Sequence, residues 1–139
     1  MKFEEVYSRR VPKGEVNDLL SEKVIGALIE VHREVGPGLT ENMYEEAVCH
    51  EFDLRGIRYT RQVPVDVHYK GKAIGATRID LIVEGKLIIE LKACEALNSV
   101  HKAQVICYLK ATGLKVALLV NFNVAALKDG IKRVILSKH

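Results

Sequence analysis

The chain has 139 residues, of which 48% are hydrophobic and 28% are charged. That balance is typical of a folded domain with a core of its own and excludes an intrinsically disordered protein. The formal net charge of +3 is weakly basic and is compatible with a nucleic-acid partner. No apolar stretch approaches a membrane span and no signal peptide is evident, so we expect one domain over residues 1–139, without a membrane partner, in the reducing cytoplasm.

The cysteines are few and widely spaced. Cys49, Cys94 and Cys107 form no CxxC pair, which argues against a disulfide framework and against a zinc site. Each stands in an apolar run, so we expect buried free thiols.

Two helices are predicted in the first part of the chain. Residues 1–16 are polar and mixed, and we expect a loose N-terminal arm or a short strand there. A first helix is predicted from about Asp18 or Ser21 to Val35, where apolar residues recur at helical spacing. A second is predicted from about Thr40, a suitable N-cap, to Arg55.

The remainder alternates between strands and one further helix. Pro64 marks the first strand as an edge or bulged strand, and the last strand is expected to close the sheet at the other edge. The helix is apolar almost all round, which favours burial on two sides. The fold class is therefore α/β (α+β), with the element order α-α-β-β-β-α-β-β. The strands are expected at residues 59–69, 73–83, 86–92, 115–122 and 131–136, and the helix at 99–112.

The strand at residues 86–92 carries two charges in an otherwise apolar run. Glu90 and Lys92 are two residues apart, so both side chains point to the same face. Burying a carboxylate and an ammonium among apolar neighbours is costly unless they are paired or used.

A hairpin decides whether a third charge joins them. Asp80 lies in the preceding strand and shares a face with Glu90 only if the numbers of cross-strand partners sum to an even value. A three-residue loop, Val83-Glu84-Gly85, with Gly85 in the left-handed conformation satisfies this condition. We therefore predict that Asp80 lies opposite Ile88, one diagonal step from Glu90.

Two carboxylates and a lysine at one place suggest metal-dependent phosphate chemistry. Mg²⁺ prefers carboxylate oxygens and keeps several waters, and substrate phosphate completes its shell. Such an ion stabilises charge on a phosphoryl group and helps form the attacking hydroxide, while a nearby ammonium orients water or neutralises charge. A partly buried structural ion pair of Lys92 with Glu90 or Asp80 explains the spacing equally well.

The order of motifs carries more information than the spacing. An Asp, a hairpin and then Glu-x-Lys in an apolar strand resemble the PD-(D/E)xK nuclease superfamily. More narrowly, the segment Gly38-Leu39-Thr40-Glu41-Asn42-Met43-Tyr44 resembles the signature of the GxxExxY proteins within that superfamily. The sequence around these motifs also resembles that family, over about residues 20–136. It includes Gln62-Val63-Pro64-Val65, Ile89-Glu90-Leu91-Lys92-Ala93 and the segment from His101 to Gly113.

The resemblance implies a nuclease fold with an αβββαβ core and its active site at one edge of a mixed sheet. It implies that Asp80 and Glu90 hold Mg²⁺ or Mn²⁺, that Lys92 is catalytic, and that Glu41 or Glu45 adds a helix-borne acid to the metal site. The sequence alone leaves the choice between Glu41 and Glu45 open. The expected function is hydrolysis of phosphodiester bonds in nucleic acid, with DNA as the expected substrate.

Four more residues are expected to support the site. Gln104 and Tyr108 match a Gln-x-x-x-Tyr motif and share a helix face with His101. Arg78 stands two residues before Asp80 and is expected on its face, where it would touch DNA backbone or pair with an acid.

Scattered cations offer a phosphate track, although ordinary solvent-exposed charges have the same pattern. These cations are Arg58, Arg61, Lys70, Lys72, Arg78, Lys102 and Lys110.

A second hypothesis belongs to another class. The chain would then be a nucleic-acid-binding or assembly module that keeps a nuclease fold without using its chemistry. The apolar helix at residues 99–112, with Cys107, suggests a packing partner such as a second subunit in a homo-oligomer. A small-molecule enzyme is a more distant alternative, because no phosphate-binding glycine loop is present.

Overall fold

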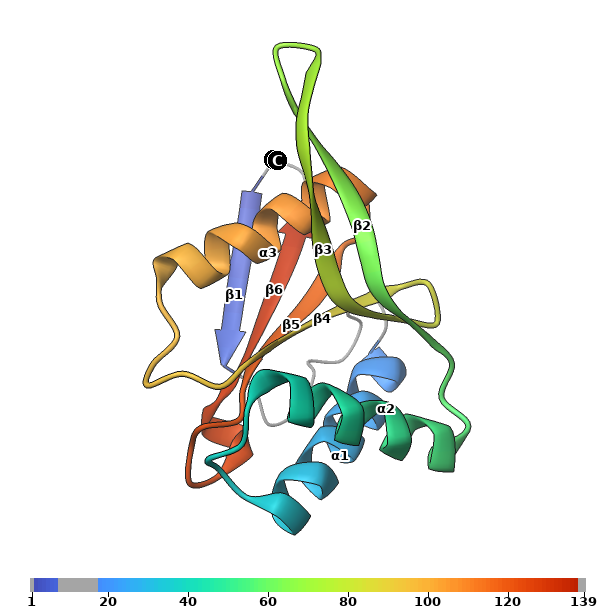
Figure 1. The fold of residues 1–139 in the computed structure, drawn as a ribbon, viewed down its shortest axis with the longest axis vertical. Helices are drawn as coiled ribbons and strands as arrows, with labels where there is room; N and C mark the ends of the chain where they lie inside the picture. The colour runs from blue at the N-terminus through green and yellow to red at the C-terminus, as the bar shows by residue number, and fades with distance from the viewer. Residues whose placement is uncertain (1, 8–17, 138–139) are drawn as a thin grey trace.

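A six-stranded mixed sheet organises the molecule (Figure 1). The computed structural model describes residues 2–7 and 18–137, and the strand order across the sheet is β1-β6-β5-β4-β3-β2. Strands β4 and β5 pair in parallel, whereas the other neighbouring strands pair antiparallel. The elements are β1 (Lys2–Tyr7), α1 (Asp18–Val35), α2 (Glu41–Arg55), β2 (Tyr59–Tyr69), β3 (Lys72–Val83), β4 (Leu87–Lys92), α3 (Ser99–Thr112), β5 (Val116–Asn121), the 3₁₀ turn η1 (Leu127–Asp129) and β6 (Ile131–Ser137).

Two hydrophobic clusters form because successive residues of a strand face opposite sides of the sheet. Ile89 of β4 and Leu118 of β5 belong to the cluster that includes residues of α1 and α2. Ile88 and Leu119, one position away, belong to the cluster that includes residues of α3. The central strands are therefore buried on both faces, which explains their continuous apolar sequence.

Local sequence signals fix the helix ends. The hydroxyl of Thr40 accepts a hydrogen bond from the amide of Met43 at 3.3 Å, which makes Thr40 the N-cap of α2 as predicted. Gly56 ends α2 in the left-handed conformation, with φ of 68°. Asn98 caps α3 through its side chain, immediately before the predicted start of that helix.

One sheet edge differs from the prediction. Strand β2 is an edge strand as expected, but β6 is not, because β1 pairs antiparallel with its outer side. Of the two expectations for residues 1–16, a loose arm or a short strand, the structure has the strand at Lys2–Tyr7. Residues 8–17 lie outside the described part of the chain.

Helix α3 is not buried on two sides as its composition suggests. Its inner face buries Val105, Tyr108 and Leu109, whereas Val100 is 72% exposed. The free thiol of Cys107 is likewise exposed, so the expectation of a buried thiol fails there, while it is confirmed for Cys49. The exposed apolar side chains are Val100 in the first turn and small ones such as Ala103 and Cys107, so little apolar surface is left in water on the outer face. No helix in the described part of the chain is long and apolar enough to cross a membrane.

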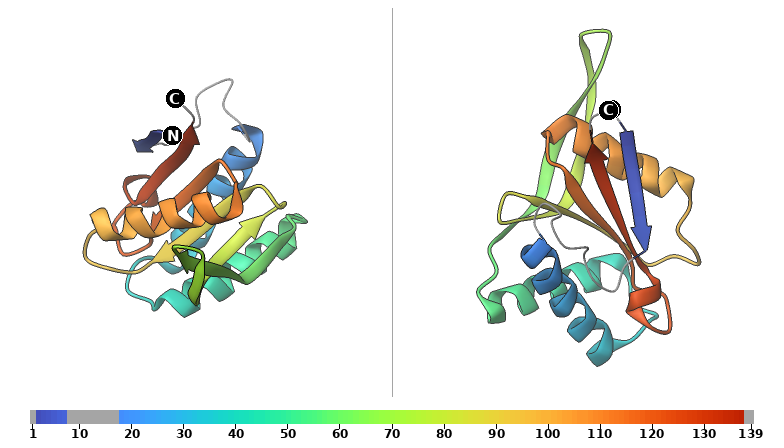
Figure 2. Two further views of the ribbon diagram at one scale, coloured as in Figure 1. Left: turned by 90° about the horizontal axis from the view of Figure 1, so that it is seen from above. Right: turned by 180° about the vertical axis from the view of Figure 1, so that it is seen from behind.

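Strands β2 and β3 form a hairpin that extends away from the rest of the molecule (Figures 1 and 2). The two strands pair along most of their length, whereas β3 pairs with β4 only from Leu81 to Val83. The predicted turn after Tyr69 is present, with Lys70 and Gly71 both at positive φ. The candidate site lies where this hairpin leaves the sheet.

Candidate active site

The turn between β3 and β4 sets the relative position of the charged residues. Glu84 and Gly85 have φ values of 53° and 67°, and the amide of Lys86 donates to the carbonyl of Val83 at 3.0 Å. Two left-handed residues in succession produce the tight turn whose twist suits an antiparallel hairpin. Val83 then pairs with Leu87, so the prediction of a left-handed Gly85 is confirmed.

The register has the even sum that the site requires. Val83 pairs with Leu87 and Ile82 with Ile88, so partner numbers sum to an even value and Asp80 falls on the same side as Glu90. The prediction that Ile88 is the cross-strand partner of Asp80 is wrong, because Ile88 pairs with Ile82. The three-residue connection comprises residues 84–86 rather than 83–85, which moves the register by two residues and brings Asp80 level with Glu90.

Strands β3 and β4 separate at the site. Their last paired residues are Leu81 and Ile89, and beyond them a side chain replaces the backbone ladder. The carboxylate of Asp80 accepts a hydrogen bond from the amide of Leu91 at 2.8 Å through Oδ2. This bond satisfies a backbone donor that strand pairing no longer reaches, and it holds the Asp80 carboxylate beside Glu90.

Glu90 is a buried carboxylate with one oxygen unused. The residue is 4% exposed, and its Oε1 has no hydrogen-bond partner among the described residues. Its Oε2 lies 3.5 Å from Nζ of Lys92. Burial, followed by the negative charge of Asp80, raises the pKa of Glu90 from its ordinary 4.5 to about 8, and Lys92 opposes that rise. Burial and the neighbouring carboxylate therefore favour the protonated form of Glu90 when no cation is bound.

Asp80 joins a second group of polar residues. Nε2 of Gln62 donates to Glu45 Oε1 at 2.8 Å and approaches Asp80 Oδ1 at 3.4 Å. Burial raises the pKa of Asp80, the charge of Glu45 raises it further, and the amide of Leu91 lowers it. Three acids from α2, β3 and β4 thus influence one small region.

The structure distinguishes the two candidate helix acids. Glu45 is buried on the sheet side of α2, where Gln62 links it to Asp80. Glu41 is exposed at the first turn of α2, where its negative charge suits the helix N-terminus, and it has no described contact with the site. The geometry brings Glu45 and not Glu41 to Asp80.

Arg61 does not belong to a free phosphate track. Its guanidinium contacts Glu45 Oε2 at 2.9 Å and Glu46 Oε2 at 2.7 Å. These two carboxylates raise the pKa of Arg61, and the Arg61 guanidinium lowers the pKa of Glu46. Arg61 therefore acts as a clamp that orients the helix acid.

Helix α3 supplies one direct contact to the charged pair. Lys92 Nζ donates to Gln104 Oε1 at 3.1 Å, so Gln104 holds the lysine beside Glu90. The hydroxyl of Tyr108 donates to the carbonyl of Arg78 at 3.0 Å, which attaches α3 to β3. Burial and the charge of Glu90 raise the pKa of Tyr108, so the phenol stays neutral.

Two predicted supporting residues have other surroundings. Nδ1 of His101 accepts from the amide of Asn98 at 3.2 Å and completes the capping box of α3. The side chain of Arg78 is exposed, and its carbonyl accepts the hydrogen bond from Tyr108 of α3. The structure therefore does not bring His101 or the Arg78 side chain to Asp80.

Gln62 is the residue that sequence reasoning missed. It has a φ of 51°, a left-handed conformation that a residue with a long side chain rarely adopts. Near it the alternation of β3 changes phase, since Ile79 and Ile82 both belong to the cluster around α3 although they are three residues apart. The available signal was the Gln62-Val63-Pro64-Val65 segment, which indicated only an irregular edge strand.

Asp80 and Glu90 offer carboxylate oxygens to a divalent cation. Within residues 2–7 and 18–137, no group of three or more His, Cys, Asp or Glu side chains is arranged to hold a metal ion. Asp80 and Glu90 nevertheless converge, and the buried Oε1 of Glu90 lacks a donor. Mg²⁺ is commonly held by one or two carboxylates with waters and substrate phosphate, so these two residues fit such an ion.

The tyrosine of the GxxExxY-like segment has a structural place. The Tyr44 hydroxyl donates to the carbonyl of Gly36 at 2.6 Å and accepts from the amide of Leu39 at 3.2 Å. Its ring stacks on Phe122, with centroids 4.4 Å apart. Tyr44 thereby fastens the α1–α2 connection to the core and positions the helix that carries Glu45.

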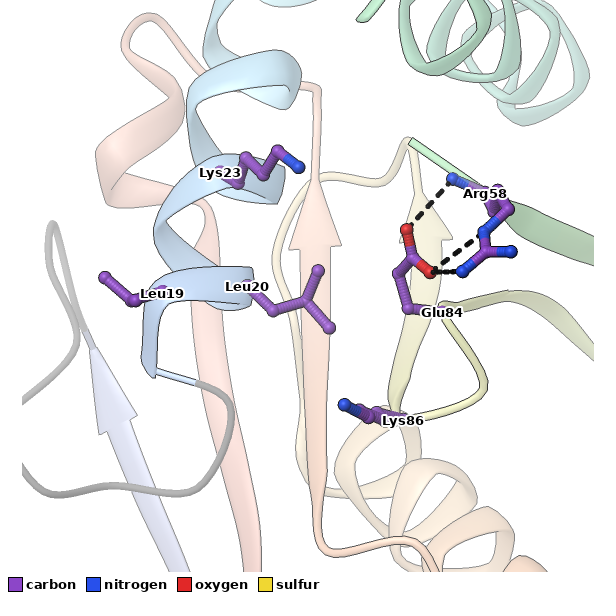
Figure 3. A pocket seen from close by; sticks show the side chains of 6 residues that line it. All are labelled: Leu19, Leu20, Lys23, Arg58, Glu84 and Lys86. Atoms are coloured by element: carbon purple, nitrogen blue, oxygen red, sulfur yellow. Dashed lines mark hydrogen bonds and ion pairs between the residues drawn. The ribbon is translucent and has the colours of Figure 1, made fainter. Parts of the chain in front are cut away.

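A separate pocket lies at the other end of the β3–β4 hairpin (Figure 3). There the guanidinium of Arg58 pairs with Glu84 at 3.2 Å. None of the residues predicted for the active site lines this pocket, which is therefore distinct from the Asp80–Glu90 site. Its lining residues are Leu19, Leu20, Lys23, Arg58, Glu84 and Lys86.

A mixed sheet with an acid on one strand and Glu-x-Lys on the next, flanked by helices on both faces, is the architecture of a nuclease fold. The family model described as the PD-(D/E)XK nuclease superfamily matches residues 18–134. The chain therefore belongs to the PD-(D/E)XK nuclease superfamily. Searches of curated proteins and of solved structures found no match.

Proposed function

We propose that the protein is a nuclease of the GxxExxY group that uses Mg²⁺ or Mn²⁺ to hydrolyse phosphodiester bonds of DNA. The observation that carries this proposal is the convergence of the half-buried carboxylate of Asp80 with the buried carboxylate of Glu90, which has Lys92 beside it. A purely structural ion pair needs one acid for one lysine. Here a second acid is added, one carboxylate oxygen has no donor, and the pKa of Glu90 is raised to about 8.

In this proposal each residue has a chemical task. Asp80 and Glu90 hold the cation, which when bound neutralises charge on the phosphate and lowers the pKa of a water molecule. Lys92, held by Gln104, orients that water or neutralises charge that develops on the phosphoryl oxygens. In the proposed hydrolysis a water oxygen would bond to phosphorus and release a proton to solvent, the bond to the leaving sugar oxygen would break, and that oxygen would take up a proton from solvent.

The surrounding residues keep the acids in place. Glu45 supports the cation through Gln62, which links it to Asp80, while Arg61 fixes the Glu45 carboxylate. Tyr108 positions β3 against α3 through the carbonyl of Arg78. These contacts come from four different elements, so the site depends on the whole fold rather than on one loop.

The direct test is hydrolysis of labelled oligonucleotides with Mg²⁺ or Mn²⁺. DNA and RNA of the same sequence, single-stranded and duplex, are compared for wild type, Asp80→Asn, Lys92→Ala and the control Lys128→Ala, which changes an exposed lysine of η1. We expect cleavage of DNA by wild type and the control, and its loss in the two site variants. Equal cleavage by all four proteins would contradict the assignment.

One observation favours a second function, that of a binding module on an unused nuclease fold. Among the described residues the acids do not form a set of three potential metal ligands. Titration calorimetry separates the two functions. Binding of Mn²⁺ that disappears in Asp80→Asn supports the nuclease, whereas DNA binding with no cation binding supports the module.

A further inference from the structure

The β2–β3 hairpin continues as an isolated ribbon beyond the sheet (Figures 1 and 2). Every residue from 66 to 76 is exposed, and the two strands pair only with each other there. We call this segment the ribbon. An isolated two-stranded ribbon is marginally stable in water, so contact with a partner would stabilise a ribbon that projects from the sheet.

The tip of the ribbon is a tight and well-defined turn. Tyr69 pairs with Lys72, and the two residues between them, Lys70 and Gly71, have φ values of 47° and 83°. Two consecutive left-handed residues form the turn whose twist matches that of the flanking strands. Nζ of Lys70 lies 5.4 Å from the centre of the Tyr69 ring, so the tip presents its cations on an ordered frame.

The exposed side chains identify the chemistry of the partner. Lys70 and Lys72 stand at the apex, and neither forms a salt bridge within the described part of the chain. Asp66 is the single acid of the ribbon. Val67, Tyr69 and Ile74 are 39%, 61% and 61% exposed. A cationic tip with apolar flanks fits a polyanion that also offers apolar surface.

We propose that the ribbon docks in the major groove of a nucleic-acid duplex whose phosphodiester lies at the Asp80–Glu90 site. This inference rests on the proposed function. The major groove of B-form DNA admits a two-stranded β-ribbon. Single strands are bound by successive aromatic platforms together with a basic groove, and the ribbon has one tyrosine, Tyr69, and no Phe or Trp.

The length of the ribbon sets the reach. Asp80 and Lys72 lie on the same strand and are 80 − 72 = 8 residues apart, which is at most about 26 Å at ~3.3 Å per residue. Base pairs are spaced by ~3.4 Å along a duplex, so the tip reaches about 8 base pairs from the reacting phosphate. Duplexes that end before that point lose the contact with the tip.

The test measures binding of the full chain by fluorescence anisotropy in EDTA, which prevents cleavage. The probes are a duplex of about two turns, a duplex of ~6 base pairs and a single strand of the longer length. The tip variant is Lys70→Ala/Lys72→Ala. The matched control is Lys115→Ala/Lys128→Ala, which removes two exposed lysines elsewhere.

We expect the tip variant to bind the long duplex up to about 60-fold more weakly at low salt, with the slope of log K against log salt reduced by ~1.8, since each phosphate contact contributes ~0.9. Its binding to the short duplex and to the single strand should match that of the control. Equal binding of the long duplex by both variants would overturn the proposal. An equal loss of affinity for single strands would also overturn it. A third contradicting result would be a wild-type dimer in sedimentation that the tip variant no longer forms, with its DNA binding unchanged.

The same samples separate failure of the ribbon from failure of the proposed function. Hydrolysis of bis(p-nitrophenyl) phosphate, a substrate too small to reach the tip, reports on the Asp80–Glu90 site alone. Activity on this ester with no effect of the tip variant on duplex binding refutes the ribbon and leaves the nuclease. Tip-dependent duplex binding without hydrolysis of any phosphodiester refutes the nuclease and leaves the ribbon.

Discussion

Strands β4 and β5 are parallel neighbours, and each buries a polar residue in an otherwise apolar run. Asn121 of β5 is 2% exposed and Glu90 of β4 is 4% exposed. Both polar atoms of the Asn121 side chain are engaged, because its oxygen accepts from the amides of Cys94 and Asn123 and its nitrogen donates to the carbonyl of Cys94. Glu90 has one carboxylate oxygen with no partner among the described residues.

The difference separates a structural polar group from a functional one. A satisfied buried amide ties two loops to the sheet and stabilises the fold. A buried carboxylate beside a second carboxylate costs stability and is retained where chemistry requires it. Substitutions at Asn121 and Glu90 should therefore have opposite effects on stability and on activity.

Glu90→Gln should give the largest effect. Under the proposed function, loss of a metal-binding carboxylate lowers the rate of DNA cleavage by about a thousandfold or more, which corresponds to several kcal/mol of lost charge stabilisation. Single-turnover cleavage with Mn²⁺ measures it, and Glu22→Gln, an exposed acid of α1, serves as the control. A rate within a few fold of wild type would remove the distinction between the two strands.

Asn121→Ala should destabilise the fold by about 3 kcal/mol, because it leaves the part-buried amides of Cys94 and Asn123 without their acceptor. Urea denaturation measures the change in the free energy of unfolding. Cleavage by the folded protein should fall far less than in Glu90→Gln. If stability were unchanged, the structural role of Asn121 would be refuted.

The pH dependence of stability should reveal Glu90 in the absence of metal. The pKa of Glu90 is about 8 in the folded state against an ordinary 4.5, so the folded state binds more protons between these values. Stability contributed by this group is therefore present below pH 4.5 and is lost as the pH rises towards 8. In urea denaturation with EDTA, the free energy of unfolding of Glu90→Gln should increase relative to that of wild type as the pH rises across that range. A difference between the two proteins that does not change with pH would contradict the raised pKa of Glu90.

Tyr44→Phe should give the smallest effect and tests a second satisfied polar group. The hydroxyl bonds to Gly36 and Leu39 are lost, while stacking on Phe122 remains. We expect a loss of about 1 kcal/mol in the free energy of unfolding. Tyr69→Phe, which changes an exposed hydroxyl at the ribbon tip, should alter stability by less than about 0.5 kcal/mol. Equal effects of both substitutions would show that the Tyr44 hydroxyl has no structural role.

Periodicity and turn chemistry were sufficient to predict most elements and the shared face of Asp80 and Glu90. The apolar runs of β4 and β5 and the glycine at position 85 are local signals, and the structure confirms them. The register was wrong by two residues because the left-handed conformation of Glu84 is not encoded by its residue type. Tertiary contacts, not local preference, decide such positions.

Long-range contacts account for the remaining differences. Gln62 itself has the left-handed conformation, and its side chain approaches Asp80. The hydrophobic periodicity of the sequence does not predict this conformation. His101 shares a helix face with Gln104, yet it caps α3 because Asn98 precedes the helix. The choice of Glu45 over Glu41 depends on how α2 packs against the sheet, which one sequence does not contain.

The central claim is that Asp80 and Glu90 share a divalent cation. A crystal soaked in Mn²⁺ and measured at the manganese absorption edge tests it most directly. We predict one anomalous peak between the two carboxylates, with Glu90 Oε1 among its ligands at about 2.2 Å. Lys92 should keep its contacts with Glu90 and Gln104. A crystal that binds Mn²⁺ elsewhere, or not at all, while Asp80 and Glu90 keep their present contacts would contradict the account.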